Sequence, residues 1–311
     1  MHMLVRGDMP PERMRRMNQA VFRGSGTALV TPFVGEQVDF EALGRLIDRQ
    51  IAGGTDALIV CGTTGEPPTL TTAEKTAVLG YALERVSDRI PVIAGTGTNS
   101  TKASVDQSIR AQRLGASGIL AVTPYYNKST QQGLYEHFTA IADAVQIPVI
   151  LYNVPSRTGV NLLPGTAARL SEHENICGVK EASGDISQMA ELARLTGDKL
   201  ALYSGNDDQV LPMLALGGQG VISVAANVLP GHMHELVESW FMGDVRRCRA
   251  LQLQILPLVK ALFSEVNPIP VKAALQMMGL CSGHMRLPLT ELSEGNRQRL
   301  ETLLRKFGAI E

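Results

Sequence analysis

A lysine closes a short apolar segment at residues 176–180, and a desolvated lysine is the residue that forms imines with carbonyl compounds. The segment reads Ile-Cys-Gly-Val-Lys, which predicts a buried strand whose last inward side chain is Lys180. Burial favours the uncharged, nucleophilic amine unless a carboxylate pairs with it. Glu181 should point to the opposite face, and we expect no inward carboxylate at the other strand ends. Lys180 is therefore either a Schiff-base nucleophile or one half of a structural ion pair.

Other predicted strand ends carry groups that suit the same chemistry. The stretch GTTGE at residues 62–66 has small residues with free backbone N–H groups, and a predicted helix begins near Thr71. It is a candidate carboxylate or phosphate cradle, although a tight turn would use the same residues. Tyr152 ends a strand and could relay a proton, or it is an ordinary tyrosine at the rim of the core. Arg157, in VPSRTG, could bind a carboxylate through two parallel hydrogen bonds, or it is a solvated loop residue.

Eight short apolar, β-rich segments alternate with amphipathic helical segments and would position these groups. They are TALVTPF, DALIVCG, PVIAGTG, GILAVTP, PVILYNV, ICGVKEA, LALYSGN and GVISVAA. Capping residues such as Asp39, Thr71 and Ser100 open several of the helices between them. This alternation predicts a parallel sheet covered by helices, and eight units favour a closed (β/α)8 TIM barrel. An open doubly wound sheet is the alternative, but neither a GxGxxG turn nor a phosphate loop supports it.

The predicted organisation has three parts. Residues 1–21 form an N-terminal extension, and residues 22–227 contain the barrel strands and the site. Residues 228–311 read as helices only, which predicts a barrel-closing helix and a C-terminal helical domain.

Composition and charge narrow the function classes. The 311 residues are 44% apolar and 19% charged, which is typical of a globular protein. The net charge of −1 indicates neither a nucleic-acid partner nor an anionic membrane surface. No secretory signal or membrane span is apparent, and the four cysteines form no metal spacing, so we expect reduced thiols and a cytoplasmic location. The six histidines do not cluster at strand ends, and we expect no metal site.

Taken with these residues, the sequence resembles the pyruvate-dependent Schiff-base lyases and aldolases that include N-acetylneuraminate lyase. Within that superfamily it is most similar to the dihydrodipicolinate synthase family, over about residues 22–310. The resemblance lies in the motifs GTTGE, TPYYNK, YNVPSRTG, GVKEASGD, YSGND and GVISVAANV, which occur in the family's order. It implies condensation of pyruvate with aspartate semialdehyde on a (β/α)8 barrel.

The resemblance also implies catalytic roles. Lys180 condenses with the keto carbon of pyruvate, and Tyr152 hydrogen-bonds to the forming imine and passes protons. Thr63 links Tyr152 to Tyr126, which is contributed across a subunit interface. The family needs no metal or organic cofactor, because the imine is the covalent intermediate, and it is commonly a homotetramer built as a dimer of dimers.

Substrate-binding roles follow from the same resemblance. Thr64 and nearby backbone N–H groups hold the carboxylate of pyruvate, and Arg157 holds the carboxylate of aspartate semialdehyde. Gly205 and Ile222 complete the pyruvate pocket.

Family members inhibited by lysine bind it in a cleft at the dimer interface, and the matching cleft here includes Lys75, Asn99 and Tyr125. Asn99 and Tyr125 fit the inhibited pattern. The position of the carboxylate that would hold the inhibitor's ammonium is Ala103, and Lys75 places a cation where the pattern has a histidine. An unpaired cation repels an ammonium group, so weak or absent lysine inhibition is predicted.

Two other functions remain open at this point. One is a sister aldolase or lyase that uses the same imine at Lys180 with a sugar acid or another aldehyde. The second is a non-catalytic barrel that binds a ligand. Ser-Arg-Thr-Gly at residues 156–159 and the paired Tyr125 and Tyr126 argue against the first, and the joint presence of the site residues argues against the second.

Overall fold

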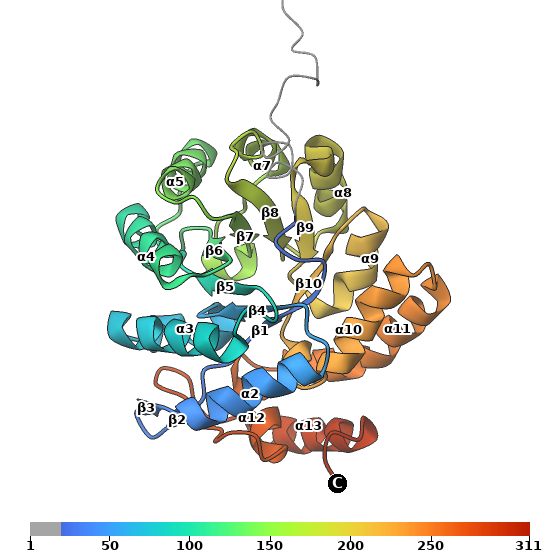
Figure 1. The fold of residues 1–311 in the computed structure, drawn as a ribbon. Helices are drawn as coiled ribbons and strands as arrows, with labels where there is room; N and C mark the ends of the chain where they lie inside the picture. Colours follow the sequence, from blue (N-terminus) through green and yellow to red (C-terminus); the bar gives the residue numbers. More distant parts are fainter. Residues whose placement is uncertain (1–19) are drawn as a thin grey trace, which may run out of the picture.

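The computed structural model describes residues 20–311, so most of the predicted N-terminal extension lies outside the described residues. Eight parallel strands close into a barrel in the order β1-β10-β9-β8-β7-β6-β5-β4 (Figure 1). This confirms the (β/α)8 prediction and excludes the open sheet. The strands are β1 (Gly24–Ala28), β4 (Ala57–Val60), β5 (Val92–Gly95), β6 (Gly118–Val122), β7 (Val149–Asn153), β8 (Ile176–Glu181), β9 (Ala201–Ser204) and β10 (Gly220–Ser223).

Three of the helices that cover the barrel begin at the predicted capping residues. Asp39 accepts a hydrogen bond from the Ala42 backbone N–H, and Thr71 forms a capping box with Glu74. Ser100 caps the next helix. The helices are α2 (Phe40–Ala52), α3 (Thr72–Val86), α4 (Thr101–Leu114), α5 (Gln131–Asp143), α6 (Pro155–Thr158), α7 (Pro164–Leu170), α8 (Ile186–Thr196) and α9 (Val210–Ala215).

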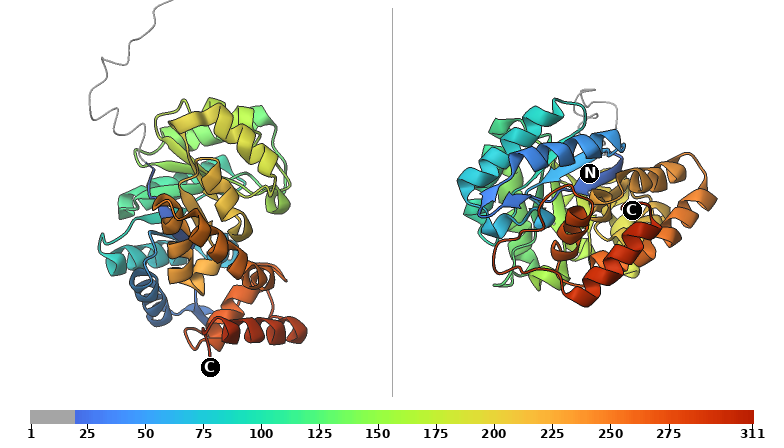
Figure 2. Two further views of the ribbon diagram at one scale, coloured as in Figure 1. Left: turned by 90° about the vertical axis from the view of Figure 1, so that its right-hand side faces the viewer. Right: turned by 90° about the horizontal axis from the view of Figure 1, so that it is seen from below.

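Helices alone follow the last barrel strand, as predicted, and the left view of Figure 2 shows the last of them, in red, at the bottom of the molecule. They are α10 (Pro230–Phe241), α11 (Val245–Leu262), α12 (Ile269–Met277) and α13 (Glu294–Lys306). The division at residues 227 and 228 remains a prediction, since α10 also packs on β1 and β10.

One local prediction was wrong. The first strand was expected from Thr27 to Phe33 but spans Gly24–Ala28, because Gly24 to Thr27 pair with β10. A small hairpin of β2 (Phe33–Val34) and β3 (Gln37–Val38) follows instead.

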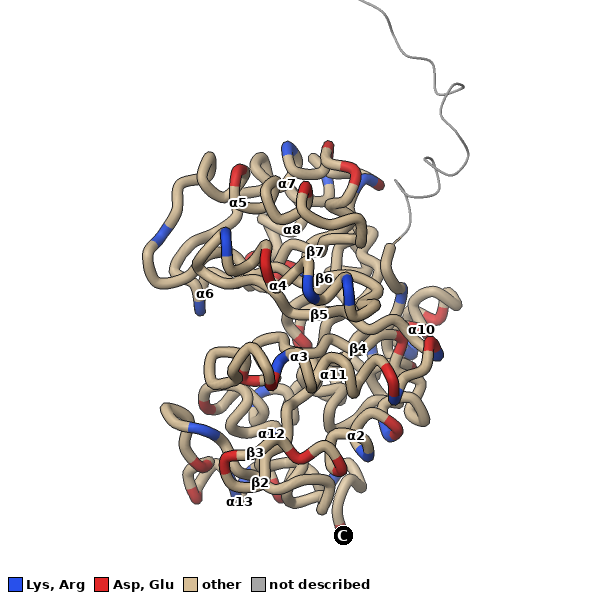
Figure 3. The backbone as a smooth tube through the Cα atoms, turned by 60° about the vertical axis from the view of Figure 1, so that its left-hand side comes forward, with Lys and Arg blue, Asp and Glu red and all other residues tan. Residues whose placement is uncertain are grey.

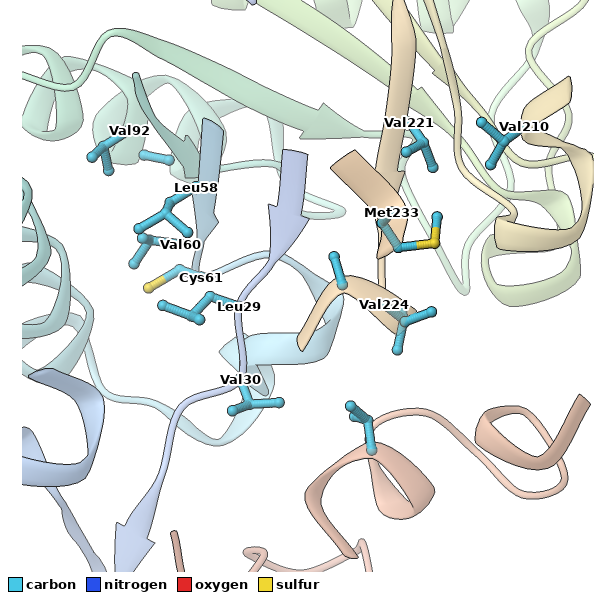
Figure 4. Close-up of a cluster of buried hydrophobic side chains, with 14 of the residues drawn as sticks. Leu29, Val30, Leu58, Val60, Cys61, Val92, Val210, Val221, Val224 and Met233 are labelled. Atoms are coloured by element: carbon cyan, nitrogen blue, oxygen red, sulfur yellow. The ribbon is translucent and has the colours of Figure 1, made fainter. Parts of the chain in front are cut away.

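The core has two layers that reflect the alternation of strand side chains. Ile59, Ile93, Ile150 and Ile222 are among the side chains that fill the barrel interior. Their neighbours pack outward under the helices, and Figure 4 shows Leu58 and Val60 of β4 pointing to the same side in this outer layer. A charged side chain in the inner layer is therefore surrounded by apolar groups. Elsewhere Lys and Arg are interspersed with Asp and Glu along the helices (Figure 3).

The described helices include none that is long and apolar enough to cross a membrane.

Candidate active site

Lys180 lies inside the barrel, near the carboxyl end of β8. It is in register with Tyr152 of β7 on one side and Tyr203 of β9 on the other, and both tyrosines belong to the inner core layer. Lys180 is 5% exposed, and its Nζ lies 4.4 Å from the centre of the Tyr152 ring. No carboxylate of residues 20–311 forms an ion pair with it. The amine is thus buried over an aromatic face without a carboxylate partner among these residues, an environment in which a lysine can act as a Schiff-base nucleophile.

Glu181 points away from Lys180, as the strand alternation predicts. Its carboxylate accepts hydrogen bonds from the Asn153 side chain at 3.0 Å and from the Ser183 backbone N–H at 2.6 Å. The Glu181 carboxylate therefore bonds to groups outside the barrel interior and does not pair with Lys180.

Asp207, just after β9, is a buried carboxylate that the sequence analysis did not single out, and its hydrogen-bond partners belong to the outer core layer. Asp207 follows β9 and is 2% exposed, with Oδ2 accepting hydrogen bonds from the backbone N–H groups of Val224 and Ala225. Burial raises the pKa of Asp207, while these hydrogen bonds and the charge of Lys180 oppose the rise. The sequence signal was present in the acidic pair after YSGN, but spacing alone did not show that Asp207 is buried.

A cavity of about 330 Å³ lies at the mouth of the barrel, and Tyr152 forms part of its wall. Thr63 and Arg157 line the same cavity, as do Asn267 and Pro268 of the C-terminal region. Lys180 is not among the lining residues, but its amine contacts the ring of Tyr152, which lines the cavity. The cavity is large enough for small organic acids.

The GTTGE stretch forms a tight 3-10 turn, Thr63–Gly65, that the C-terminal region supports from behind. The Asn267 side-chain amide donates to Thr64 Oγ1 at 3.0 Å, and the Thr31 hydroxyl donates to the Gly65 carbonyl at 2.8 Å. Glu66 ends the turn in the left-handed region at φ 55°. Asn267 was missed in the sequence, because it lies 203 residues from Thr64.

Arg157 and Tyr126 both lie at the outer edge of the site. Arg157 sits on α6, which follows the end of β7, and its side chain borders the cavity. Tyr126 is 91% exposed and adopts a φ of 74°, so it projects from the surface of this chain. Thr63 and Tyr152 are close to the cavity, but the expected Tyr152–Thr63–Tyr126 relay is not assembled within one chain.

Gly205 lies beside Lys180. A Cβ at Gly205 would come within 2.6 Å of Ala182 Cβ and 3.2 Å of Lys180 Cε, so a side chain there would clash with Ala182 and crowd the lysine. Ile222 is fully buried in the barrel interior.

Two of the three predicted cleft residues reach the cavity. Lys75 of α3 and Tyr125 line it, whereas Asn99 is exposed in the loop before α4 and is not in the cavity wall.

The sequence analysis did not identify a second buried lysine, Lys272, that lies beside the 62–66 turn. Lys272 of α12 forms an ion pair with Glu66 at 2.7 Å, and both side chains are fully buried. Its neighbours in the segment Ile-Pro-Val-Lys-Ala-Ala-Leu are apolar, which is the sequence signal that could have marked it.

Among the residues that the structure describes, no three His, Cys, Asp or Glu side chains gather in a way that could hold a metal ion.

Comparison with known proteins identifies relatives over nearly the whole chain. The model of the dihydrodipicolinate synthetase family matches residues 21–307. A 4-hydroxy-tetrahydrodipicolinate synthase of Caldicellulosiruptor saccharolyticus is 56% identical over 289 residues, covering 93% of this chain and 98% of the relative. The enzyme of the same name from Thermoanaerobacter sp. strain X514 is 54% identical over 291 residues, with the same coverage.

Solved structures agree with the sequence relatives. A crystal structure of dihydrodipicolinate synthase from Aquifex aeolicus superposes with a TM-score of 0.91 at 48% identity, covering 93% of this chain and 99% of that one.

Proposed function

Since the chain belongs to the dihydrodipicolinate synthetase family, we propose that it condenses pyruvate with L-aspartate-4-semialdehyde through a Schiff base at Lys180. The product is 4-hydroxy-tetrahydrodipicolinate, and the reaction is the first committed step of diaminopimelate and lysine biosynthesis in the cytoplasm. The observation that carries the covalent assignment is the amine of Lys180, which is buried against the Tyr152 ring without a carboxylate partner in the described chain.

The reaction begins when the Lys180 amine adds to the keto carbon of pyruvate and water leaves, which forms an imine. The imine withdraws electrons from the adjacent methyl group, and loss of a methyl proton gives an enamine. The enamine carbon attacks the aldehyde carbon of the second substrate, whose oxygen takes up a proton. The amino group of the adduct then adds to the former keto carbon and displaces Lys180. The imine supplies the electron sink, so the proposed reaction uses no metal or organic cofactor.

Fixed polar groups would support these steps. Thr64 and the backbone N–H groups of its turn hold the pyruvate carboxylate, and the buried position of this turn supports that assignment. Arg157 holds the carboxylate of aspartate semialdehyde at the mouth of the cavity. The phenol of Tyr152 moves protons at the imine without creating a buried charge.

The proposed enzyme is a homotetramer built as a dimer of dimers, in which Tyr126 completes the relay through Thr63 in a neighbouring copy. A tyrosine that is 91% exposed and held at φ 74° supports this part of the proposal, because such a side chain gains little from projecting into water.

Borohydride trapping tests the proposed function. The chain is incubated with pyruvate and borohydride, with and without aspartate semialdehyde, and the adduct is located by intact mass and peptide mapping. We expect a reduced pyruvyl adduct on Lys180 that disappears when the semialdehyde is added. Lys199→Ala is the matched control, since Lys199 pairs with Glu172 on the surface and should leave trapping unchanged.

Three outcomes separate the candidate functions. Loss of the adduct in Lys180→Ala but not in Lys199→Ala supports the covalent assignment. An adduct that the semialdehyde does not discharge keeps the Schiff base but indicates another acceptor, such as a sugar-acid aldehyde. Absence of any adduct in the unmodified chain contradicts the enzyme and favours a binding protein.

A further inference from the structure

A buried ion pair lies directly behind the turn that is proposed to hold pyruvate. Glu66 Oε1 contacts Lys272 Nζ at 2.7 Å, and neither side chain is exposed to solvent. Lys272 Nζ also donates to the Thr31 carbonyl at 3.0 Å and lies 4.3 Å from the centre of the Phe33 ring. The pair therefore joins α12 to the end of the 62–66 turn within an apolar and aromatic environment.

Glu66 belongs to the wall of the same cavity as Thr63 and Tyr152. It follows Thr64 by two residues, and the turn between them is tied down by Asn267 and Thr31. Glu66 is thus separated by one residue, Gly65, from Thr64, which is proposed to hold the pyruvate carboxylate.

The charge of Glu66 opposes the binding of an anionic substrate. Pyruvate carries a carboxylate, and two carboxylates in one weakly hydrated site repel each other strongly. Glu66 Oε2 accepts no hydrogen bond from residues 20–311, so Lys272 is the direct ion-pair partner that compensates its charge, and Arg286 contributes from farther away. Burial lowers the pKa of Lys272, while the Glu66 carboxylate opposes that change. Together the two residues present no net charge to the cavity.

We propose that Lys272 is a positioning residue that neutralises Glu66 and so allows the 62–66 turn to bind the carboxylate of a keto acid. This inference rests on the proposed function, because it concerns the pyruvate site of that reaction. Lys272 does not touch the substrate in this role and acts through Glu66 and the turn.

The experiment compares four chains in the pyruvate-trapping assay: the unmodified chain, Lys272→Met, Glu66→Gln/Lys272→Met and Arg286→Met. Lys272→Met leaves Glu66 uncompensated and should raise the half-saturating pyruvate concentration about tenfold or more. The double variant removes both charges and should return it to within about threefold of the unmodified chain. The fully trapped amount should change less than the half-saturating concentration.

Arg286→Met is the matched structural control. Arg286 also comes from the C-terminal region, lies 4.5 Å from the centre of the same Phe33 ring, and pairs with Glu74 of α3. Removing it loosens the same junction and withdraws a more distant positive charge from Glu66, but it keeps the direct ion pair of Glu66 and Lys272. We expect lower stability and a half-saturating pyruvate concentration that rises much less than in Lys272→Met.

Methyl pyruvate, which has no carboxylate charge, provides a second readout. Its half-saturating concentration should change little in Lys272→Met, because only the anion is repelled. An equal rise for pyruvate and methyl pyruvate, or failure of the double variant to restore pyruvate binding, would show that Lys272 acts through packing alone and would overturn the proposal. If Lys272→Met does not fold, a double variant that folds but binds pyruvate tenfold more weakly also overturns it. A complete lack of trapping in the unmodified chain overturns the proposed function and this inference together.

Discussion

Lys180 and Lys272 are both buried lysines within one chain, yet their surroundings are opposite. Lys272 has a carboxylate at 2.7 Å and a backbone carbonyl at 3.0 Å, so its ammonium is fully accommodated. Lys180 has the face of Tyr152 at 4.4 Å and no ion-pair partner among the described residues. Burial alone therefore does not make a lysine reactive. The presence or absence of a paired carboxylate distinguishes a structural cation from a nucleophile.

The comparison predicts that replacing Lys180 abolishes activity while sparing the fold. Lys180→Arg keeps a positive charge but cannot form an imine, so kcat should fall by at least about a thousandfold. No ion pair is lost in the described chain, and the free energy of unfolding should change little. Steady-state kinetics and urea denaturation measure the two quantities. Activity close to that of the unmodified chain would remove Lys180 from the mechanism.

Replacing Lys272 should have its largest effect on stability. Lys272→Met leaves Glu66 as an unpaired buried charge, which should lower the free energy of unfolding by about 3–5 kcal/mol. Glu66→Gln/Lys272→Met should recover most of that loss, because neither remaining side chain is charged. Urea denaturation of both variants checks this, and a double variant as unstable as the single one would contradict the electrostatic explanation.

Tyr152 lies against Lys180 and should affect proton transfer more than imine formation. Tyr152→Phe keeps the aromatic face but removes the hydroxyl, so kcat should fall about a hundredfold while the Lys180 adduct still forms with pyruvate and borohydride. The measurement is kcat alongside trapping by intact mass. An equal loss of kcat and of the trapped Lys180 adduct would mean that the phenol is needed for imine formation.

The ion pair of Arg286 and Glu74, which lies at the same junction as Lys272, should make the free energy of unfolding depend on pH. Hydrogen bonds from Arg286 hold the pKa of Glu74 at about 2, below its ordinary value of 4.5. This contribution is complete above pH 4.5 and is lost as the pH falls through about 2. Glu74→Gln should therefore cost about 1 kcal/mol at neutral pH and almost nothing near the acid end. Urea unfolding of the unmodified chain and of Glu74→Gln as a function of pH measures this cost. A difference in the free energy of unfolding that stays constant at all pH values would contradict the prediction.

A third lysine, Lys75, lines the cavity and is expected to produce the smallest effect. Because its cation would repel an added ammonium group, millimolar lysine should leave the steady-state rate nearly unchanged. Lys75→His with Ala103→Glu should introduce inhibition if charge is the determining feature. Strong inhibition of the unmodified chain by sub-millimolar lysine would show that the cleft accommodates the ammonium in another way.

Much of the fold and of the site could be predicted because the relevant signals are local. A strand of apolar residues alternates its faces, and parallel strands bring their carboxyl ends to one side, so Lys180 and Tyr152 could be placed together from the sequence alone. The burial of Asp207 could not be predicted, because it depends on how the loop after β9 packs against the segment after β10. The start of β1 was misplaced for a related reason, since pairing with β10 rather than local propensity selects its residues.

The sequence by itself determined the barrel, the capping residues of its helices and the strand-end positions of Lys180, Tyr152 and Arg157, because each depends on a short periodic pattern. Only the tertiary structure decided which buried lysine has a partner. Glu66 and Lys272 are 206 residues apart, and Asn267 and Thr64 are 203 apart. Ion pairs and hydrogen bonds depend on distances of a few ångströms between side chains, and folding alone brings such distant residues together.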